Sequence, residues 1–253
     1  VEKYQNRNVF ILTSKQEKED YKTIFYLHGG SYVAELNDTH WRFFTDIIHD
    51  TGATIIVPDY PLTPQYQYTD VFAMIEPLYE QIASKVEQED LILMGDSAGG
   101  GMALALLEKV TVEDKKVPSK TILISPWLDV TMENSAIDQV QSKDPLLNKQ
   151  VLKLAGIAYA GTEENTKNYL VSPIYGPLTG LKNIVIFTGT NDILNPDVHR
   201  LKQIGEEQKA SIQIKETYGA THDWLLNRYQ DASFENELAT SAYEDLIKEI
   251  ENK

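Results

Sequence analysis

The fold is decided by residues 91–100, which read LILMGDSAGG. A short apolar run typical of a buried strand leads into Gly-x-Ser-x-Gly, and the small residues of a close-packed helix start follow. A serine can project its Oγ from so tight a turn only when its neighbours two positions away have almost no side chain, as Gly95 and Gly99 do. Ser97 would then stand at a helix N-terminus, where unpaired amides and the helix dipole favour developing negative charge. The pattern predicts a nucleophilic serine.

A second apolar run ends in glycines at residues 24–32, which read IFYLHGGSY. Glycines after a strand let backbone N–H groups point into a site without obstruction. Beside a Gly-x-Ser-x-Gly serine, such a loop supplies oxyanion-hole donors together with the N–H of the residue after the nucleophile. We therefore predict that Gly29, Gly30 and Ala98 are the donors. A plain strand-to-helix turn is the alternative interpretation of this segment taken alone.

The chain also has an acid and a histidine in the order that such a serine requires. Residues 184–192 read IVIFTGTND and residues 215–222 read KETYGATH, so Asp192 and His222 each follow an expected strand. Residues just beyond parallel strands meet at one edge of the sheet. The other histidines lie in expected helices or in the glycine loop: His28, His40, His49 and His199. We predict Ser97 as nucleophile, His222 as base and Asp192 as the acid that orients it.

Composition argues against several other classes of protein. The 253 residues are 42% hydrophobic and 24% charged, as in an ordinary globular protein. The formal net charge of −15 opposes binding to nucleic acid or to anionic membrane surfaces. No stretch approaches the roughly 20 apolar residues of a membrane span, and the absence of cysteine removes thiolate chemistry. We expect no nucleic-acid partner, no stable membrane insertion and a cytoplasmic location. The chain begins with Val1, so an upstream segment is an open alternative.

Apolar runs rich in β-branched residues alternate with helix-like stretches, which predicts an α/β fold with a mostly parallel sheet and helices on both faces. The expected strands are residues 9–12, 23–27, 53–57, 91–94, 121–124, 184–188 and 212–217. The expected helices are residues 39–49, 69–85, 98–109, 148–160, 197–208 and 235–251. Pro77 should kink the second helix or end it early. No repeat or linker-like segment interrupts the chain, so we expect one domain over residues 1–253.

These motifs together resemble the hormone-sensitive-lipase branch of the α/β-hydrolases, bacterial esterases and lipases with an HGG(G) oxyanion loop and a GDSAGG elbow. The other similar segments are residues 58–64 (PDYPLTP), 124–129 (ISPWLD), 169–173 (YLVSP) and 189–196 (GTNDILNP). The resemblance implies the α/β-hydrolase fold and the same triad and oxyanion donors. Relatives often pair through sheet edges or terminal helices, so a homodimer is left open.

Several positions depart from the pattern of that family. Ser31 stands where many relatives have a third glycine, Gly101 where asparagine is frequent, and Asp223-Trp224 where smaller or simply apolar residues are usual. Relatives also tend to carry a helical cap built partly from residues ahead of the first strands, whereas few residues precede His28 here. We expect a small or incomplete cap, with contributions from residues of about 129–160 and from the N-terminal segment. The irregular stretch 129–147 would cover a ligand site or serve as a plain surface connection.

The residues therefore predict a serine carboxylesterase that takes a small-molecule ester of short to medium acyl chain through an acyl-enzyme. The expected pocket walls are the aromatic and aliphatic residues that flank the catalytic ones: Tyr32, Trp127, Leu128, Ile193, Leu194 and Trp224. Hydrolysis of amides, peptides or thioesters on the same triad is an alternative, and a non-catalytic binding protein is a second. There is no His-Glu-x-x-His run and no Walker lysine, so we expect neither a metal nor a cofactor.

Overall fold

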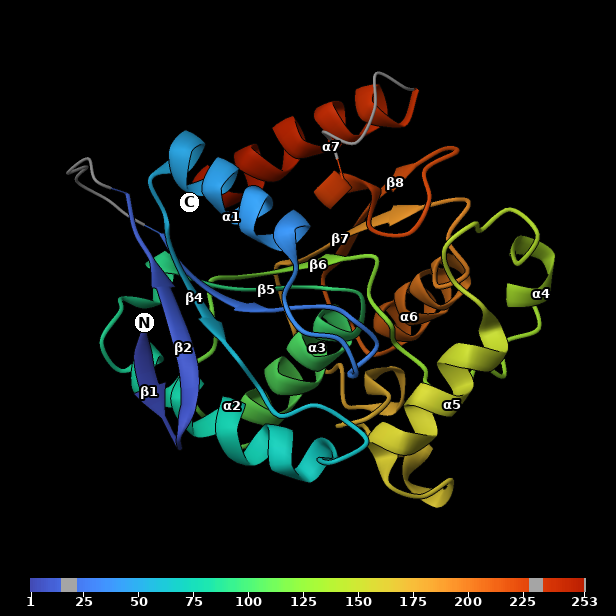
Figure 1. The fold of residues 1–253 in the computed structure, drawn as a ribbon, viewed down its shortest axis with the longest axis horizontal. Helices are drawn as coiled ribbons and strands as arrows, with labels where there is room; N and C mark the ends of the chain where they lie inside the picture. Colours follow the sequence, from blue (N-terminus) through green and yellow to red (C-terminus); the bar gives the residue numbers. More distant parts are fainter. Residues whose placement is uncertain (15–21, 228–233, 253) are drawn as a thin grey trace.

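A computed structural model, which describes residues 1–14, 22–227 and 234–252, contains one eight-stranded sheet in the order β1-β2-β4-β3-β5-β6-β7-β8 (Figure 1). The strands are β1 Glu2–Tyr4, β2 Arg7–Leu12, β3 Thr23–Leu27, β4 Thr54–Pro58, β5 Leu91–Asp96, β6 Lys120–Ile124, β7 Ile184–Gly189 and β8 Ile212–Thr217. The β1–β2 and β2–β4 pairs are antiparallel, and the pairs from β4 through β8 are parallel. The predicted α/β-hydrolase fold is confirmed.

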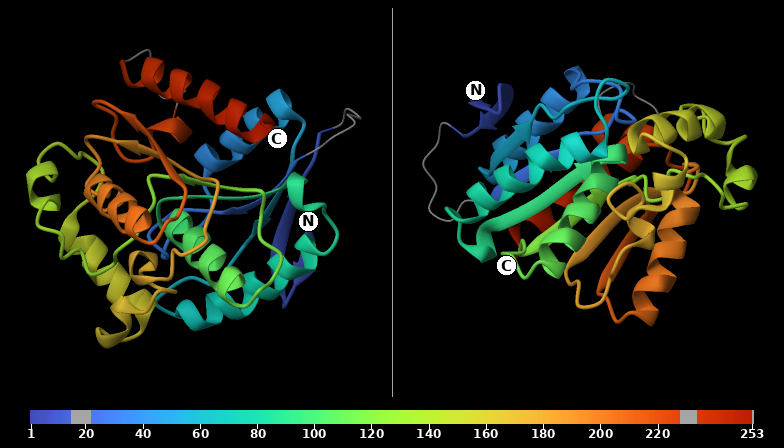
Figure 2. Two further views of the ribbon diagram at one scale, coloured as in Figure 1. Left: turned by 180° about the vertical axis from the view of Figure 1, so that it is seen from behind. Right: turned by 90° about the horizontal axis from the view of Figure 1, so that it is seen from below.

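Helices cover both faces of the sheet (Figures 1 and 2). One face packs against α1 Asp38–Thr51 and α7 Phe234–Glu251. The other packs against α2 Tyr68–Ala83, α3 Ser97–Val112 and α6 Asn195–Glu207, with α4 Ile137–Val140 and α5 Lys149–Ala160 farther out. Short 3-10 turns lie at Gln88–Asp90, Glu164–Lys167, Pro173–Tyr175 and Trp224–Asn227. Within the described ranges, no helix is both long enough and apolar enough to cross a membrane.

The central strands are hydrophobic throughout because both of their faces are buried. In β3, Ile24 and Tyr26 belong to the core under α1 and α7, while Phe25 and Leu27 belong to the core under α2 and α3. Successive strand side chains point to opposite faces, so a sheet covered on both sides needs an unbroken apolar run. The same register places Leu27 beside Gly95 of β5. The loops that follow these two strands are therefore neighbours.

Helix α2 continues past Pro77, which excludes an early end, one of the two outcomes expected of this proline. It runs from Tyr68 to Ala83. Proline removes the N–H that would bond the carbonyl four residues earlier. That carbonyl, on Ala73, instead accepts a hydrogen bond from the Gln5 side chain at 3.1 Å. The freed acceptor is satisfied by the N-terminal segment, and the helix continues.

Residues 129–147 form an ordered connection that is tied to the loop after β7. The Asp144 carboxylate accepts the N–H groups of Leu146 and Leu147, both at 2.9 Å, and the N–H of Ile193 at 3.0 Å. Ile193 directly follows Asp192, so this connection supports the segment that carries the predicted acid. In the N-terminal segment, residues 1–14 supply β1 and β2, and residues 15–21 lie outside the described residues.

Candidate active site

The junction between β5 and α3 holds Ser97 in a strained turn. Ser97 adopts a left-handed backbone conformation, with φ 50°, which residues other than glycine seldom do. Its surroundings require small residues: a Cβ on Gly95 would collide with the Gly99 carbonyl, and a Cβ on Gly99 would collide with the carbonyl that ends β3. Asp96 occupies the N-cap position of α3 but makes no capping hydrogen bond. The first-turn amides, including that of Ala98, are therefore unpaired within the helix beside Ser97.

Three strand ends bring Ser97, His222 and Asp192 together. His222 Nε2 lies 2.9 Å from Ser97 Oγ, and His222 Nδ1 lies 2.9 Å from Asp192 Oδ2. Strands β5, β7 and β8 belong to one parallel sheet, so the loops at their carboxyl ends share an edge. The exposed fractions of the three residues are 5%, 6% and 0%. An Nδ1–H that donates to Asp192 leaves the Nε2 lone pair to accept the Ser97 hydroxyl proton.

Asp223 places a second carboxylate against the same histidine. Its Oδ2 lies 3.1 Å from His222 Nε2, the nitrogen that also contacts Ser97. The backbone of Asp223 is left-handed, with φ 52°, and its N–H donates to Ser125 Oγ at 3.2 Å. Its other oxygen, Oδ1, is buried without a hydrogen-bond partner among the described residues. The sequence marked Asp223 only as a departure from the family pattern.

These charges control the protonation of the histidine. Burial by itself lowers the pKa of His222, but the negative charges of Asp223 and Asp192 outweigh it and hold that pKa well above its usual range. Burial raises the pKa of the Asp223 carboxyl to about 6, against the opposing effect of His222. Two carboxylates thus stabilise the protonated imidazole.

The Asp96 carboxylate holds the glycine loop, residues 28–32, through a hydrogen bond from the Gly29 N–H. Its Oδ1 accepts the Tyr26 hydroxyl at 2.7 Å and the N–H of Gly29 at 3.0 Å, and its Oδ2 lies 3.3 Å from His40 Nε2. His40 Nδ1 lies 3.3 Å from the backbone nitrogen and 3.0 Å from Oδ1 of Asn37, the N-cap of α1. Burial by itself lowers the pKa of His40, but the negative charge of Asp96 outweighs it and raises that pKa. The Gly29 amide is therefore already engaged with Asp96, which differs from its predicted use as an oxyanion donor.

Two other amides of the glycine loop have no acceptor among the described residues. Gly30 has φ 115° and Ser31 has φ 54°, and no described residue accepts a hydrogen bond from the N–H of either. Both residues line the cavity next to Ser97. With the unpaired amide of Ala98, they are the groups that could stabilise an oxyanion. Ser31 was not predicted as a donor. Its left-handed backbone conformation is one that glycine adopts more readily, in keeping with the glycine expected at this position from the family resemblance.

The cavity beside Ser97 has a volume of about 220 Å³ and a largely polar lining. The residues that line it are Gly30, Ser31, Ala34, Glu35, Asn37, Thr39, His40, Asp96, Ser97, Leu147, His222, Asp223, Leu226 and Asn227. Two large apolar side chains take part, and one of them comes from the 129–147 connection. This cavity suits a small ligand with polar groups.

The six residues expected as pocket walls pack in the core and do not line this cavity. Tyr32, Trp127, Leu128, Ile193, Leu194 and Trp224 are each at most 2% exposed. The Tyr32 ring stacks on Tyr159 with the centroids 3.6 Å apart and on Trp127 with the centroids 5.4 Å apart. Proximity in sequence to the catalytic residues was a poor guide because packing decides where each side chain points.

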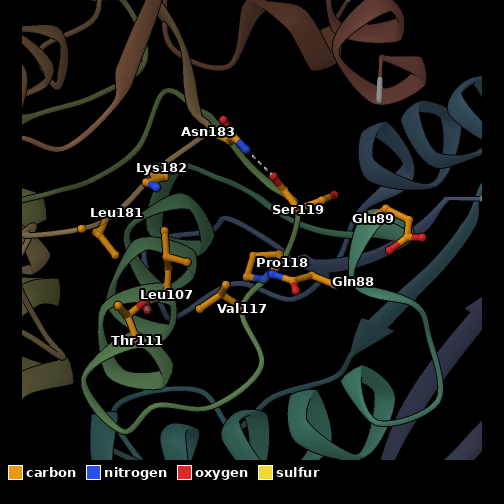
Figure 3. Close-up of a pocket in the computed structure, with 11 residues that line it drawn as sticks. Gln88, Glu89, Leu107, Thr111, Val117, Pro118, Ser119, Leu181, Lys182 and Asn183 are labelled. Atoms are coloured by element: carbon orange, nitrogen blue, oxygen red, sulfur yellow. Dashed lines mark hydrogen bonds between the residues drawn. The ribbon is translucent and has the colours of Figure 1, made fainter.

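A larger hollow of about 530 Å³ lies at the opposite, amino ends of β5, β6 and β7 (Figure 3). Leu107, Thr111 and Val117 form part of its lining, and Asn183 Nδ2 donates to the Ser119 carbonyl at 2.9 Å. The lining contains no histidine. The residues that line this hollow show no pairing of a nucleophile with a base.

Residues 24–226 match the alpha/beta hydrolase fold family, and the chain belongs to that family. An esterase from Acinetobacter venetianus is 31% identical over 194 residues, and the match covers 76% of this chain and 64% of the relative's length. A solved structure from Staphylococcus aureus, described provisionally as an esterase, matches with a TM-score of 0.89 and 26% identity over 99% of this chain and 82% of its own. An esterase of the bacterial hormone-sensitive lipase family shares the fold, with a TM-score of 0.85 and 23% identity over 97% and 82% of the two chains.

Proposed function

We propose that this protein is a serine carboxylesterase that hydrolyses small carboxylic esters. The observation that carries the proposal is the chain of contacts at 2.9 Å from Ser97 through His222 to Asp192, at the carboxyl edge of an α/β-hydrolase sheet. The esterase name of the Acinetobacter relative supports the same reaction class. The homodimer and the cytoplasmic location suggested by the sequence stay predictions.

Acylation follows from the positions of the three side chains. His222 Nε2 takes the proton of Ser97 as Oγ attacks the ester carbonyl, and Asp192 stabilises the imidazolium that forms. The N–H groups of Gly30 and Ala98, with that of Ser31, receive the negative charge of the tetrahedral oxyanion, each donor contributing a factor on the order of 10²–10³ in turnover. His222 then protonates the leaving alcohol, and the acyl group remains on Ser97.

Deacylation repeats the same steps with water. His222 removes a proton from a water molecule that attacks the acyl-enzyme, and the same amides stabilise the second oxyanion. Collapse of this intermediate releases the acid and returns the proton to Ser97 Oγ. The small volume of the cavity and the stacked Tyr32, Trp127 and Tyr159 rings favour the short end of the expected acyl range.

The test is hydrolysis of p-nitrophenyl esters from acetate to laurate by the wild type and by Ser97→Ala. We expect the wild type to cleave acetate and butyrate, with activity falling as the chain lengthens. Ser97→Ala should lose turnover by about 10³-fold or more while keeping its melting temperature. Full activity of the variant would overturn the proposal. Cleavage of amides with no cleavage of esters would favour the alternative reaction on the same triad.

A further inference from the structure

We infer that the site prefers small esters whose alcohol portion carries an ammonium group, and that Asp223 is the carboxylate that recognises this charge. The inference rests on the proposed esterase function and specifies its substrate class. Asp223 lines the cavity beside Ser97, and no step of the reaction derived above uses its carboxylate.

Asp223 differs from the other two carboxylates near Ser97 in how its oxygens are satisfied. Asp192 accepts hydrogen bonds from His222 Nδ1 at 2.9 Å and from the N–H of Leu194 at 2.8 Å. Asp96 has three partners beneath the glycine loop, Tyr26, Gly29 and His40. The carboxylate of Asp223 is paired through Oδ2 with His222 Nε2, and its Oδ1 has no hydrogen-bond partner in the part of the chain that the structure describes.

The Asp223 carboxylate has still less compensation when His222 is neutral, the state in which His222 can act as a base. His222 can take the proton of Ser97 only when Nε2 is unprotonated, and a neutral His222 offers no positive charge to Asp223. A carboxylate enclosed in protein without a cation or a full set of donors is costly. An ammonium group in the cavity would replace the positive charge that Asp223 loses, and would do so in the state that reacts.

Position assigns this charge to the alcohol side of the ester. His222 Nε2 delivers a proton to the leaving oxygen, so the alcohol portion lies against that nitrogen in the reacting complex. Asp223 Oδ2 is 3.1 Å from the same nitrogen. A group attached a few bonds beyond the leaving oxygen can therefore reach Asp223, whereas the carbonyl oxygen is directed toward the amides of Gly30 and Ala98.

Apart from His40 and His222, which face Asp96 and Asp223, the charged side chains of the lining are carboxylates. Besides Asp223 and the paired Asp96, the cavity is lined by the exposed Glu35, and its lining residues include no lysine or arginine. The whole chain carries a formal charge of −15. Such a site concentrates cations and repels anions. An anionic ester of the same size should be a poor substrate.

The test compares two acetate esters of the same shape, acetylcholine and 3,3-dimethylbutyl acetate, in which carbon replaces the charged nitrogen. We expect the wild type to favour acetylcholine about tenfold in kcat/KM, as for a partly screened charge pair. Asp223→Asn, which keeps the shape but removes the charge, should bring this ratio close to one. Glu35→Gln is the matched control, because it removes an exposed carboxylate of the same lining and should change the ratio less.

Equal kcat/KM for the two esters in the wild type, or a preference that survives in Asp223→Asn, would overturn the inference. Hydrolysis of both esters without any preference would leave the esterase function standing. Failure to cleave either ester while p-nitrophenyl acetate is still hydrolysed would overturn the inference alone, and failure on all three esters would overturn the esterase function as well. Should Asp223→Asn not fold, choline and 3,3-dimethylbutan-1-ol can be compared as inhibitors of p-nitrophenyl acetate hydrolysis by the wild type. Stronger inhibition by choline supports the inference, and equal inhibition contradicts it.

Discussion

Two hollows at opposite ends of the same parallel strands differ in size and in chemistry. The hollow at the amino ends, shown in Figure 3, has about 530 Å³, and the cavity at the carboxyl ends has about 220 Å³. Helix α3 contributes to both, with Ser97 at its N-terminus in the small cavity and Leu107 and Thr111 from its C-terminal half in the large one. The positive end of the helix dipole thus faces the cavity where an oxyanion would form. The direction of α3 and the polar side chains gathered around Ser97 mark the smaller cavity as the candidate active site, although the other hollow is larger.

The largest expected effect on activity comes from replacing one serine in each hollow and comparing the two variants. Ser97→Ala should reduce kcat/KM for p-nitrophenyl acetate by about 10³-fold or more, because it removes the nucleophile. Ser119→Ala, at the amino-end hollow, removes only a hydrogen bond to the Leu91 carbonyl and should leave kcat/KM unchanged. A large loss in Ser119→Ala with little loss in Ser97→Ala would reverse the assignment.

A smaller loss is expected from the support beneath the glycine loop. Asp96→Asn replaces an acceptor of three donors by a group that is partly a donor, so the Gly29 amide and the loop that carries Gly30 would shift. Misplacing one oxyanion donor costs on the order of 10²-fold in kcat, and we expect a loss up to that size with a smaller change in KM. Tyr26→Phe removes a single donor to Asp96 and should have a weaker effect. Steady-state kinetics of the two variants would contradict this account if Asp96→Asn kept wild-type kcat.

The pH profile tests the second carboxylate on the base. The negative charges of Asp223 and Asp192 hold the pKa of His222 above its usual range despite burial. Removing one of those charges in Asp223→Asn lowers that pKa, so more His222 is neutral at a given acidic pH. The acidic limb of kcat/KM for a neutral ester should move to lower pH, with severalfold higher activity near pH 6. An unmoved limb in the variant would show that Asp223 does not act on His222.

The smallest effect is expected on stability alone. Glu108 on α3 is fully buried, and its carboxylate oxygens have no hydrogen-bond partner among residues that the structure describes. Burial raises the pKa of Glu108 well above its usual range, so the folded protein keeps a proton that the unfolded chain releases. Stability therefore falls as pH rises through the interval between the two pKa values. Glu108→Gln should flatten this dependence and raise the free energy of unfolding at alkaline pH by roughly 1–3 kcal/mol.

Urea denaturation at acidic and alkaline pH measures this effect, and esterase assays serve as the control. Glu108 neighbours Leu107, which lines the amino-end hollow. Activity should therefore be unchanged. An unaltered pH dependence of unfolding in Glu108→Gln would show that this carboxyl is not held protonated in the folded protein.

Sequence patterns predicted the sheet well where burial on both faces forces an apolar run. Residues 23–27 and 212–217 were predicted with the bounds that β3 and β8 have. Strand β1 was missed because Glu2–Tyr4 is short and mostly exposed, and so carries no hydrophobic pattern. The early end considered for α2 does not occur, and the Ala73 carbonyl that Pro77 leaves without its helical donor accepts a hydrogen bond from Gln5, a residue distant in the chain. Local pattern cannot report such a contact.

In the candidate site, too, some features follow from local sequence signals and others depend on contacts between distant parts of the chain. The convergence of Ser97, Asp192 and His222 was predictable because strand order and strand ends determine it. The roles of Asp96 and His40 were not, because they meet across 56 residues of chain. The prediction of the pocket walls was wrong for a related reason. The side chain of a loop residue next to a catalytic one can point into the core as easily as into the cavity. Glycines and strand ends are local signals, whereas the polar lining is a property of the assembled fold.

Labelling with a fluorophosphonate, followed by mass spectrometry of the digested protein, tests the central claim most directly. The reagent modifies only a serine activated by a neighbouring base. We predict one modified residue, Ser97, with labelling lost in Ser97→Ala and strongly reduced when His222 is replaced by alanine. Absence of labelling, or modification at another serine while Ser97 stays free, would contradict the account.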